Sequence, residues 1–80
     1  MGETRKLTSI DYRTLIRIFE LDGFKVARHK GDHISMIKSG TMRPLVVKCS
    51  PRKVPVAHVR TIMTTAGMSR ERFFELLGQV

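Results

Sequence analysis

The sequence predicts one α+β domain in which a helix is followed by three antiparallel strands and then by a helix and a last short helix. Three observations predict this order. Apolar residues recur at helical spacing near the N-terminus, alternate with other residues between positions 24 and 49, and return to helical spacing after position 55. The 80 residues contain no internal repeat, so we predict a single domain over residues 1–80, with one small core.

The first helix is predicted over residues 9–22. Thr8 is its expected N-cap, with Asp11 three residues later in an approximate capping box. Gly23 is the expected C-terminal stop. Apolar residues at helical spacing give the helix one apolar face: Tyr12, Leu15, Ile16 and Phe19. Residues 1–6 are polar, and we expect them to be frayed.

Three strands are predicted over residues 24–29, 33–38 and about 43–49, joined as an antiparallel meander. The first turn is Lys30-Gly31-Asp32, where Gly31 supplies a left-handed conformation and His33 opens the second strand. Alternation assigns two sets of residues to opposite faces of the first strand: Phe24, Val26 and Arg28 against Lys25, Ala27 and His29. The same alternation divides the second strand: Ile34 and Met36 against His33, Ser35 and Ile37.

The C-terminal third of the chain is predicted to be a basic loop and two helices. The loop spans residues 50–55 and contains the pair Arg52-Lys53. Pro55 suits the first position of a helix, and Gly67 ends that helix. Ser69 is the expected cap of a last short helix. Helices on one face of the small sheet would leave its other face exposed to water.

Charge is the clearest global signal. Fifteen Lys and Arg against seven Asp and Glu give a net charge of +8, which attracts polyanions and makes nucleic acid the leading partner class. An anionic membrane surface and an acidic protein also fit this charge. Cys49 is the single cysteine, so no internal disulfide forms and no zinc site is indicated. With no apolar stretch of transmembrane length or signal peptide in the sequence, we expect a cytoplasmic protein.

An ordered set of short motifs resembles the HicA (YcfA-like) toxin family over about residues 7–77. The matching pieces are Gly23-Phe24, Arg28, Lys30-Gly31-Asp32-His33, Val46-Val47, the basic loop and residues 62–69 (IMTTAGMS). The resemblance implies a double-stranded RNA-binding-domain-like fold. It also implies the toxin of a type II toxin–antitoxin system, an endoribonuclease that cleaves messenger RNA and is partnered by a HicB antitoxin. The family's motif histidine corresponds to His33.

The residues themselves support chemistry on RNA. A histidine titrates near neutral pH and can act as general acid or base towards the 2′-hydroxyl that RNA carries. We therefore predict His33 as the catalytic residue, without a metal or other cofactor. Basic residues are predicted to bind the phosphates: Arg28, Lys30, Lys38, Arg52 and Lys53. His29 and His58 are expected to be structural or surface histidines.

Two other functions fit the same composition. The chain could be an RNA-binding module without catalysis, or an interaction protein whose basic face docks an acidic partner. Only His33 separates these functions in the sequence, because binding requires charge while cleavage also requires a proton-transfer group.

Overall fold

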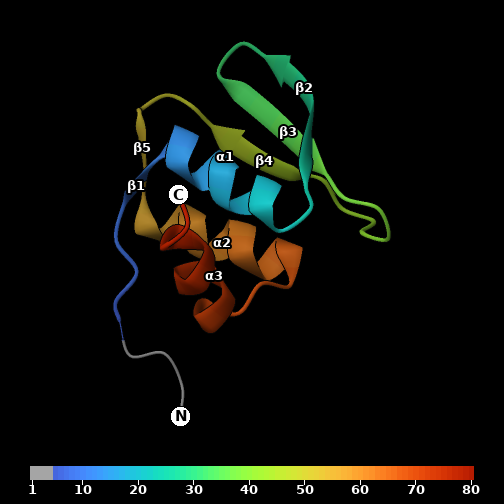
Figure 1. Cartoon of the computed structure of the whole chain (residues 1–80). Helices are drawn as coiled ribbons and strands as arrows, with labels where there is room; N and C mark the ends of the chain where they lie inside the picture. The colour runs from blue at the N-terminus through green and yellow to red at the C-terminus, as the bar shows by residue number, and fades with distance from the viewer. Residues whose placement is uncertain (1–4) are drawn as a thin grey trace.

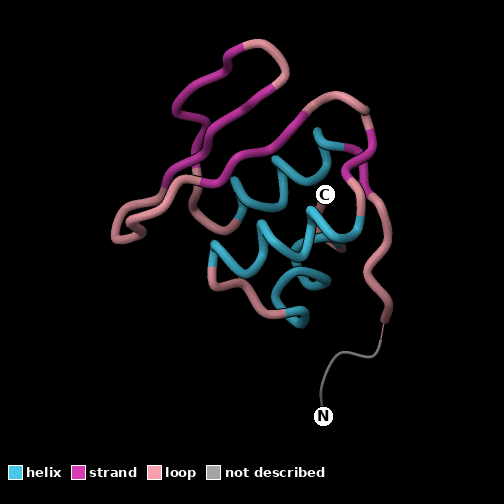
Figure 2. Tube along the Cα trace, turned by 180° about the vertical axis from the view of Figure 1, so that it is seen from behind, coloured by secondary structure: helices cyan, strands magenta, loops and turns pink. Residues whose placement is uncertain are grey.

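The computed structural model describes residues 5–80 and confirms the predicted α+β order (Figure 1). The elements are β1 (Ile10–Asp11), α1 (Tyr12–Leu21), β2 (Lys25–Lys30), β3 (His33–Ile37), β4 (Leu45–Lys48), β5 (Lys53–Val54), α2 (Val56–Ala66) and α3 (Arg70–Leu77). β2, β3 and β4 form an antiparallel sheet in that order, and the helices lie together on one side of it (Figures 1 and 2). This arrangement is consistent with the double-stranded RNA-binding-domain-like fold.

The first helix begins later than predicted. Its N-cap is Asp11, whose carboxylate accepts a hydrogen bond from the backbone N–H of Arg13 at 2.9 Å. Thr8 does not cap the helix, because the chain at Ile10–Asp11 is extended and pairs with β5 as a two-stranded ribbon. Arg52 then donates to the same carboxylate at 3.0 Å. Asp11 therefore joins the start of α1 to the loop that precedes α2.

The first helix ends as predicted, at Gly23. The φ angle of Gly23 is +100°, a left-handed conformation that glycine adopts without steric cost. The N–H of Gly23 donates to Glu20 O at 3.0 Å, and the N–H of Phe24 donates to Phe19 O at 2.9 Å. This is a Schellman motif, with the rings of Phe24 and Phe19 in edge-to-face contact at 5.7 Å between centroids. The motif fixes the direction in which β2 leaves the helix.

The faces of β2 differ from the predicted alternation. The register shifts between Val26 and Arg28, so Ala27 is an extra residue in a bulge. Arg28 lies opposite Ser35 and Lys25 lies opposite Ile37. The prediction that Arg28 shares a face with Val26 is therefore wrong: Arg28 and Lys25 share the face of His33, while Val26 and His29 lie on the other face, opposite Met36 and Ile34.

One apolar core lies between the sheet and the helices. Ile34 and Met36 of β3 and Leu45 and Val47 of β4 are buried in it, as the alternation predicted for β3. The helices contribute buried side chains from all three segments: Leu15, Ile18, Phe19, Val59, Ile62, Met63, Phe73, Phe74 and Leu76. The other face of the sheet is left exposed to solvent.

Acidic residues connect the elements around this core. Asp22 accepts from Arg72 Nε of α3 at 3.1 Å and pairs with Lys38 Nζ at 3.5 Å. The hydrogen bond to Asp22 raises the pKa of Arg72. Asp22 thereby ties the end of α1 to α3 and to the end of the β2–β3 hairpin.

The N-terminal segment was expected to be frayed over residues 1–6. Residues 1–4 lie outside the described part of the chain. The guanidinium of Arg5 lies 4.4 Å from the ring centroid of Phe74. The backbone carbonyl of Arg5 accepts a hydrogen bond from the guanidinium of Arg70. None of the helices within residues 5–80 has the length and hydropathy needed to cross a bilayer.

The stability of this fold is expected to depend on Asp11 in acid. The N–H of Arg13 lowers the pKa of Asp11 below its ordinary value, so the charged form stabilises the folded state above that value and the stabilisation is lost as pH falls through the folded pKa. Asp11→Asn keeps the capping acceptor but removes the charge. We expect its urea midpoint to fall less than that of the wild type between pH 7 and pH 3.

Glu71→Gln is the control, since Glu71 is an exposed carboxyl on α3. Equal acid sensitivity in Asp11→Asn and wild type would contradict this role for Asp11.

Candidate active site

A two-residue turn positions His33 at the start of β3. Lys30 and His33 are paired across the strands, and Gly31 and Asp32 form the loop between them. Gly31 has a φ of +59°, and no described non-glycine residue has a positive φ, so the turn has the type II′ pattern with glycine at its first central position. This turn matches the right-handed twist of the strands. The backbone of His33 is therefore fixed by pairing on both sides, with β2 and with β4.

The exposed face of the sheet gathers the candidate residues. Residues directly opposite one another in a sheet point to the same side, and His33 and Ser35 alternate with the buried Ile34 and Met36. Arg28 and Lys30 lie opposite Ser35 and His33 and so share their face. A depression of about 500 Å³ lies there, lined by Arg28, Lys30, Gly31, Asp32, His33, Ser35 and Val46.

A carboxylate orients the imidazole. His33 Nδ1 lies 2.9 Å from Asp32 Oδ1, and the two side chains are 54% and 46% exposed. The carboxylate can only accept, so a proton on Nδ1 would point at this acceptor. In the neutral ring with that proton, Nε2 carries the lone pair and is the atom able to take a proton from another molecule. The imidazole is half exposed, so solvent reaches it.

The cations beside His33 are available to a ligand. Among residues 5–80, no ion pair involves Arg28, Lys30 or Lys48. All three side chains are exposed. An anion on this face would therefore meet basic groups that are not already neutralised by carboxylates of the described chain.

The other predicted phosphate-binding residues lie elsewhere. Lys38 is at the opposite end of the hairpin, paired with Asp22 and 5.5 Å from the ring centroid of Phe24. Arg52 is held by Asp11, and Lys53 lies in β5 opposite Asp11. The structure brings Arg28, Lys30 and His33 together around one depression. Lys38, Arg52 and Lys53 are not among the residues that line it.

Two further histidines lie outside the depression. His29 is on the opposite face of β2, with Nε2 3.1 Å from Gly31 O and 4.0 Å from Cys49 Sγ. His58 lies on α2 and lines a separate depression with β4 and the segment before it. The structural and surface roles expected for these two histidines are compatible with their positions.

Lys48 is a neighbour of His33 that the sequence did not reveal. It is paired with His33 across β3 and β4. Alternation within residues 43–49 separates Lys48 from the buried Leu45 and Val47, but only the register between the two strands tells which residue Lys48 faces. The sequence indicates a turn at Ser39-Gly40-Thr41 between the two strands, but a turn signal in a connection of this length does not set the register of the strands that it joins.

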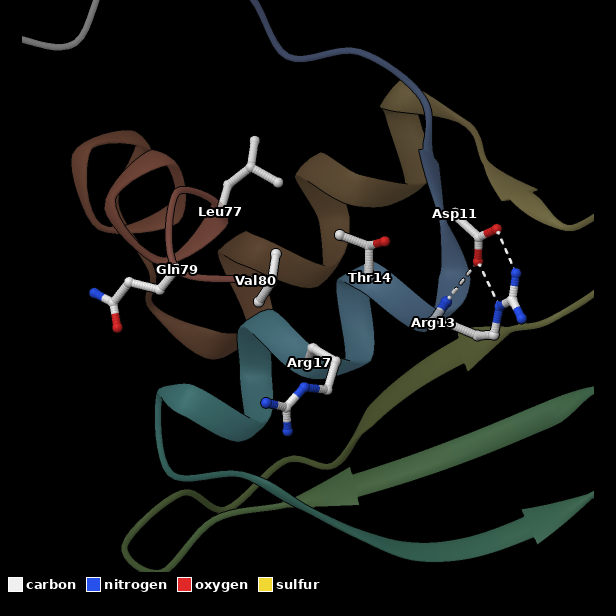
Figure 3. A pocket seen from close by; sticks show the side chains of 7 residues that line it. All are labelled: Asp11, Arg13, Thr14, Arg17, Leu77, Gln79 and Val80. Atoms are coloured by element: carbon white, nitrogen blue, oxygen red, sulfur yellow. Dashed lines mark hydrogen bonds and ion pairs between the residues drawn. The ribbon is translucent and has the colours of Figure 1, made fainter.

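A second depression, of about 630 Å³, lies between α1 and the C-terminal residues (Figure 3). Asp11, Arg13, Thr14, Arg17, Leu77, Gln79 and Val80 line it. Its carboxylate, Asp11, is held by Arg13 and Arg52 and caps α1. None of these seven residues is a histidine, so the depression on the sheet is the better candidate for proton transfer at neutral pH.

Residues 5–80 contain no group of three or more His, Cys, Asp or Glu that could hold a metal ion.

The chain is similar to one family of known proteins. The model of that family, described as HicA toxin of bacterial toxin-antitoxin, matches residues 12–68. No curated protein and no solved structure matches the chain. The matched segment includes the whole hairpin and the depression on its exposed face.

The orientation of His33 by Asp32 can be tested without any substrate. In Asp32→Ala the Nδ1 proton loses its acceptor, so we expect the neutral ring to shift from the Nδ1–H form towards the Nε2–H form that free imidazoles prefer. Two-bond ¹H–¹⁵N spectra at a pH where the ring is neutral distinguish the two forms. Asp32→Asn, whose amide oxygen can still accept, should keep more of the Nδ1–H form. An unchanged spectrum in Asp32→Ala would contradict the assigned contact.

Proposed function

The chain belongs to the HicA toxin family of bacterial toxin–antitoxin systems, and on that premise we propose that it is a metal-independent endoribonuclease that cleaves messenger RNA in the cytoplasm. One observation carries the proposal. An exposed imidazole, with a carboxylate beside its Nδ1, lies next to cations that have no ion pair within residues 5–80, on the solvent-exposed face of the sheet.

The proposed reaction uses the nucleophile of the substrate. His33 Nε2 takes the proton of a ribose 2′-hydroxyl, and the 2′-oxygen attacks the adjacent phosphorus. The bond from phosphorus to the 5′-oxygen breaks, and that oxygen is protonated by water or by a neighbouring acid. The products are a 2′,3′-cyclic phosphate and a 5′-hydroxyl. The proton on His33 returns to solvent, which restores the neutral base.

Two cations are proposed to hold the phosphate during this reaction. Arg28 presents a planar fork suited to two phosphate oxygens, and Lys30 presents a compact charge next to His33. Their role is supported by the shared depression and by the absence of ion pairs at either residue within residues 5–80. Lys38, Arg52 and Lys53 are proposed to add long-range attraction for RNA as part of the +8 charge.

The open site favours a modest rate. His33 is half exposed, so water reaches the reacting groups and screens the charges that stabilise the transition state. General acid–base catalysis contributes about 10²–10⁴-fold on its own. Such an enzyme is suited to long, accessible RNA rather than to a small substrate enclosed in a cavity.

An RNA-binding module without catalysis is the second candidate function. The observation in its favour is that Arg28 and Lys30 would bind phosphate whether or not His33 transfers a proton. The two candidates differ in the fate of bound RNA. Incubation with long RNA, with and without a chelator, separates them because only the enzyme yields shortened products.

A toxin of this kind has an antitoxin partner, as the family implies. We propose that the partner is a HicB-like protein whose acidic surface covers the basic face and His33. Charge complementarity supports this, because the exposed face presents Arg28, Lys30 and Lys48 without carboxylate partners inside residues 5–80.

Removing the imidazole tests catalysis directly. We expect His33→Ala to abolish RNA cleavage and growth inhibition, because proton transfer worth about 10²–10⁴-fold disappears. The fold and RNA binding should persist, since substitutions at exposed positions usually change stability by about 0.5 kcal/mol or less. Melting temperature and cleavage are measured on the same preparation, with His58→Ala as the matched histidine control. Cleavage at the wild-type rate would remove His33 from the mechanism, and a collapsed melting temperature would indicate a structural role.

Charge reversal tests the partner surface. We expect Arg28→Glu and Lys30→Glu each to weaken binding of the co-expressed partner at least about tenfold, because like charges across an interface cost several kcal/mol. Arg60→Glu makes the same charge change on α2, outside this face. Titration calorimetry with the purified partner measures all three affinities. Equal affinities for all three variants would contradict docking on the sheet.

A further inference from the structure

Lys48 and His33 occupy the more closely spaced type of pair in the antiparallel ladder. The N–H of Cys49 donates to Asp32 O at 2.9 Å. These two residues flank the Lys48–His33 pair, which is therefore a non-hydrogen-bonded pair of the antiparallel ladder. In such pairs the Cα atoms are about 4.5 Å apart and the side chains approach more closely than in the alternate pairs.

The burial pattern fixes the side to which Lys48 points. Leu45 and Val47 of β4 are buried, while Val46 and Lys48 are exposed. Because residues alternate along a strand, Lys48 lies on the face that carries His33 and Ser35. It has no ion pair among residues 5–80, so its ammonium group is available to an anion on this face.

We propose that Lys48 contacts the scissile phosphate and stabilises the charge that develops on it in the transition state. The proposal rests on the nuclease function above and adds a residue to the same site. Lys48 lies beyond the residues that line the depression, and it reaches the phosphate from the β4 side of His33.

The sheet order explains why this position is useful. β3 is the central strand, with β2 on one side and β4 on the other. Arg28 and Lys30 come from β2, so both cations of the depression lie on one side of His33. Lys48 is the cation on the other side. A phosphate held over His33 is thus flanked by positive charge from both neighbouring strands.

Lys48 is expected to stabilise the transition state more than it stabilises the bound RNA. When the 2′-oxygen attacks, the phosphate passes from one negative charge towards two, and charge builds on the departing 5′-oxygen. A fixed cation interacts more strongly with this state than with the starting phosphodiester. Loss of Lys48 should therefore lower kcat more than it raises KM.

The first arm of the experiment measures cleavage. Full-length Lys48→Met and Lys48→Arg are compared with wild type on an RNA with one cleavable linkage. We expect Lys48→Met to lower kcat about 10–100-fold, below the 10²–10³-fold seen for enclosed electrostatic donors because this site is wet. Lys48→Arg keeps the charge and should recover most of the rate. Lys6→Met is the matched control, because it removes the same charge from an exposed lysine that lies away from His33. The next residue, Leu7, lines a depression with Met63 and Met68, on the helical side of the molecule.

The second arm measures binding and needs no cleavage. The probe is the same RNA with a 2′-O-methyl group at the scissile position. One lost phosphate contact on single-stranded RNA should lower the slope of log affinity against log salt by about 0.7. We expect this change in Lys48→Met and not in Lys6→Met. If wild type cleaves no RNA, the nuclease function fails, while a lower slope in Lys48→Met would still support the phosphate contact.

Melting temperatures of all variants check that each one folds. Wild-type kcat together with a wild-type salt slope in Lys48→Met would overturn the proposal. Failure of Lys48→Arg to recover the rate, with its fold intact, would also overturn it, because charge would then not be the property that matters. Loss of rate in Lys48→Met with recovery in Lys48→Arg supports it.

Discussion

The antiparallel register of β2, β3 and β4 is the constraint on which the rest of the structure depends. Side chains alternate between faces along each strand, so one register sends Ile34, Met36 and Val47 into the core and His33 into solvent. A slip by one residue would exchange these two sets. The burial of the apolar set therefore also fixes where the imidazole and its neighbouring cations lie. The core and the candidate active site therefore lie on opposite faces of the same sheet.

The acidic residues are distributed differently between the helical side of the fold and the exposed face of the sheet. Asp11 and Asp22 are engaged in contacts that hold elements together, at the start and the end of α1. Glu75 is paired with Arg72 within α3. On the exposed face of the sheet, Asp32 contacts His33 and leaves the nearby cations without carboxylate partners within residues 5–80. The exposed face of the sheet thus carries cations beside a titratable group, whereas Asp11 and Asp22 neutralise cations elsewhere in the fold.

Much of this arrangement could be predicted from the sequence, because local patterns determine it. Alternation located β3 and its buried face, and Gly23 and Gly67 located two helix ends. The bulge at Ala27 could not be predicted, since alanine fits a regular strand as well, and it moved Arg28 to the face of His33. The ribbon of β1 and β5 has only two residues in each strand, too few for a periodic signal. The position of Lys48 beside His33 could not be predicted either, because it depends on the register between β3 and β4.

Attack by the 2′-hydroxyl of RNA with His33 as the base is the central proposal for this protein, and the chemical ends of the products test it most directly. RNA cleaved in the presence of excess EDTA would be analysed by mass spectrometry and by labelling of its new 5′-ends. We expect undiminished cleavage, with 2′,3′-cyclic phosphate and 5′-hydroxyl ends. Products with 5′-phosphate and 3′-hydroxyl ends, or activity abolished by the chelator, would contradict it.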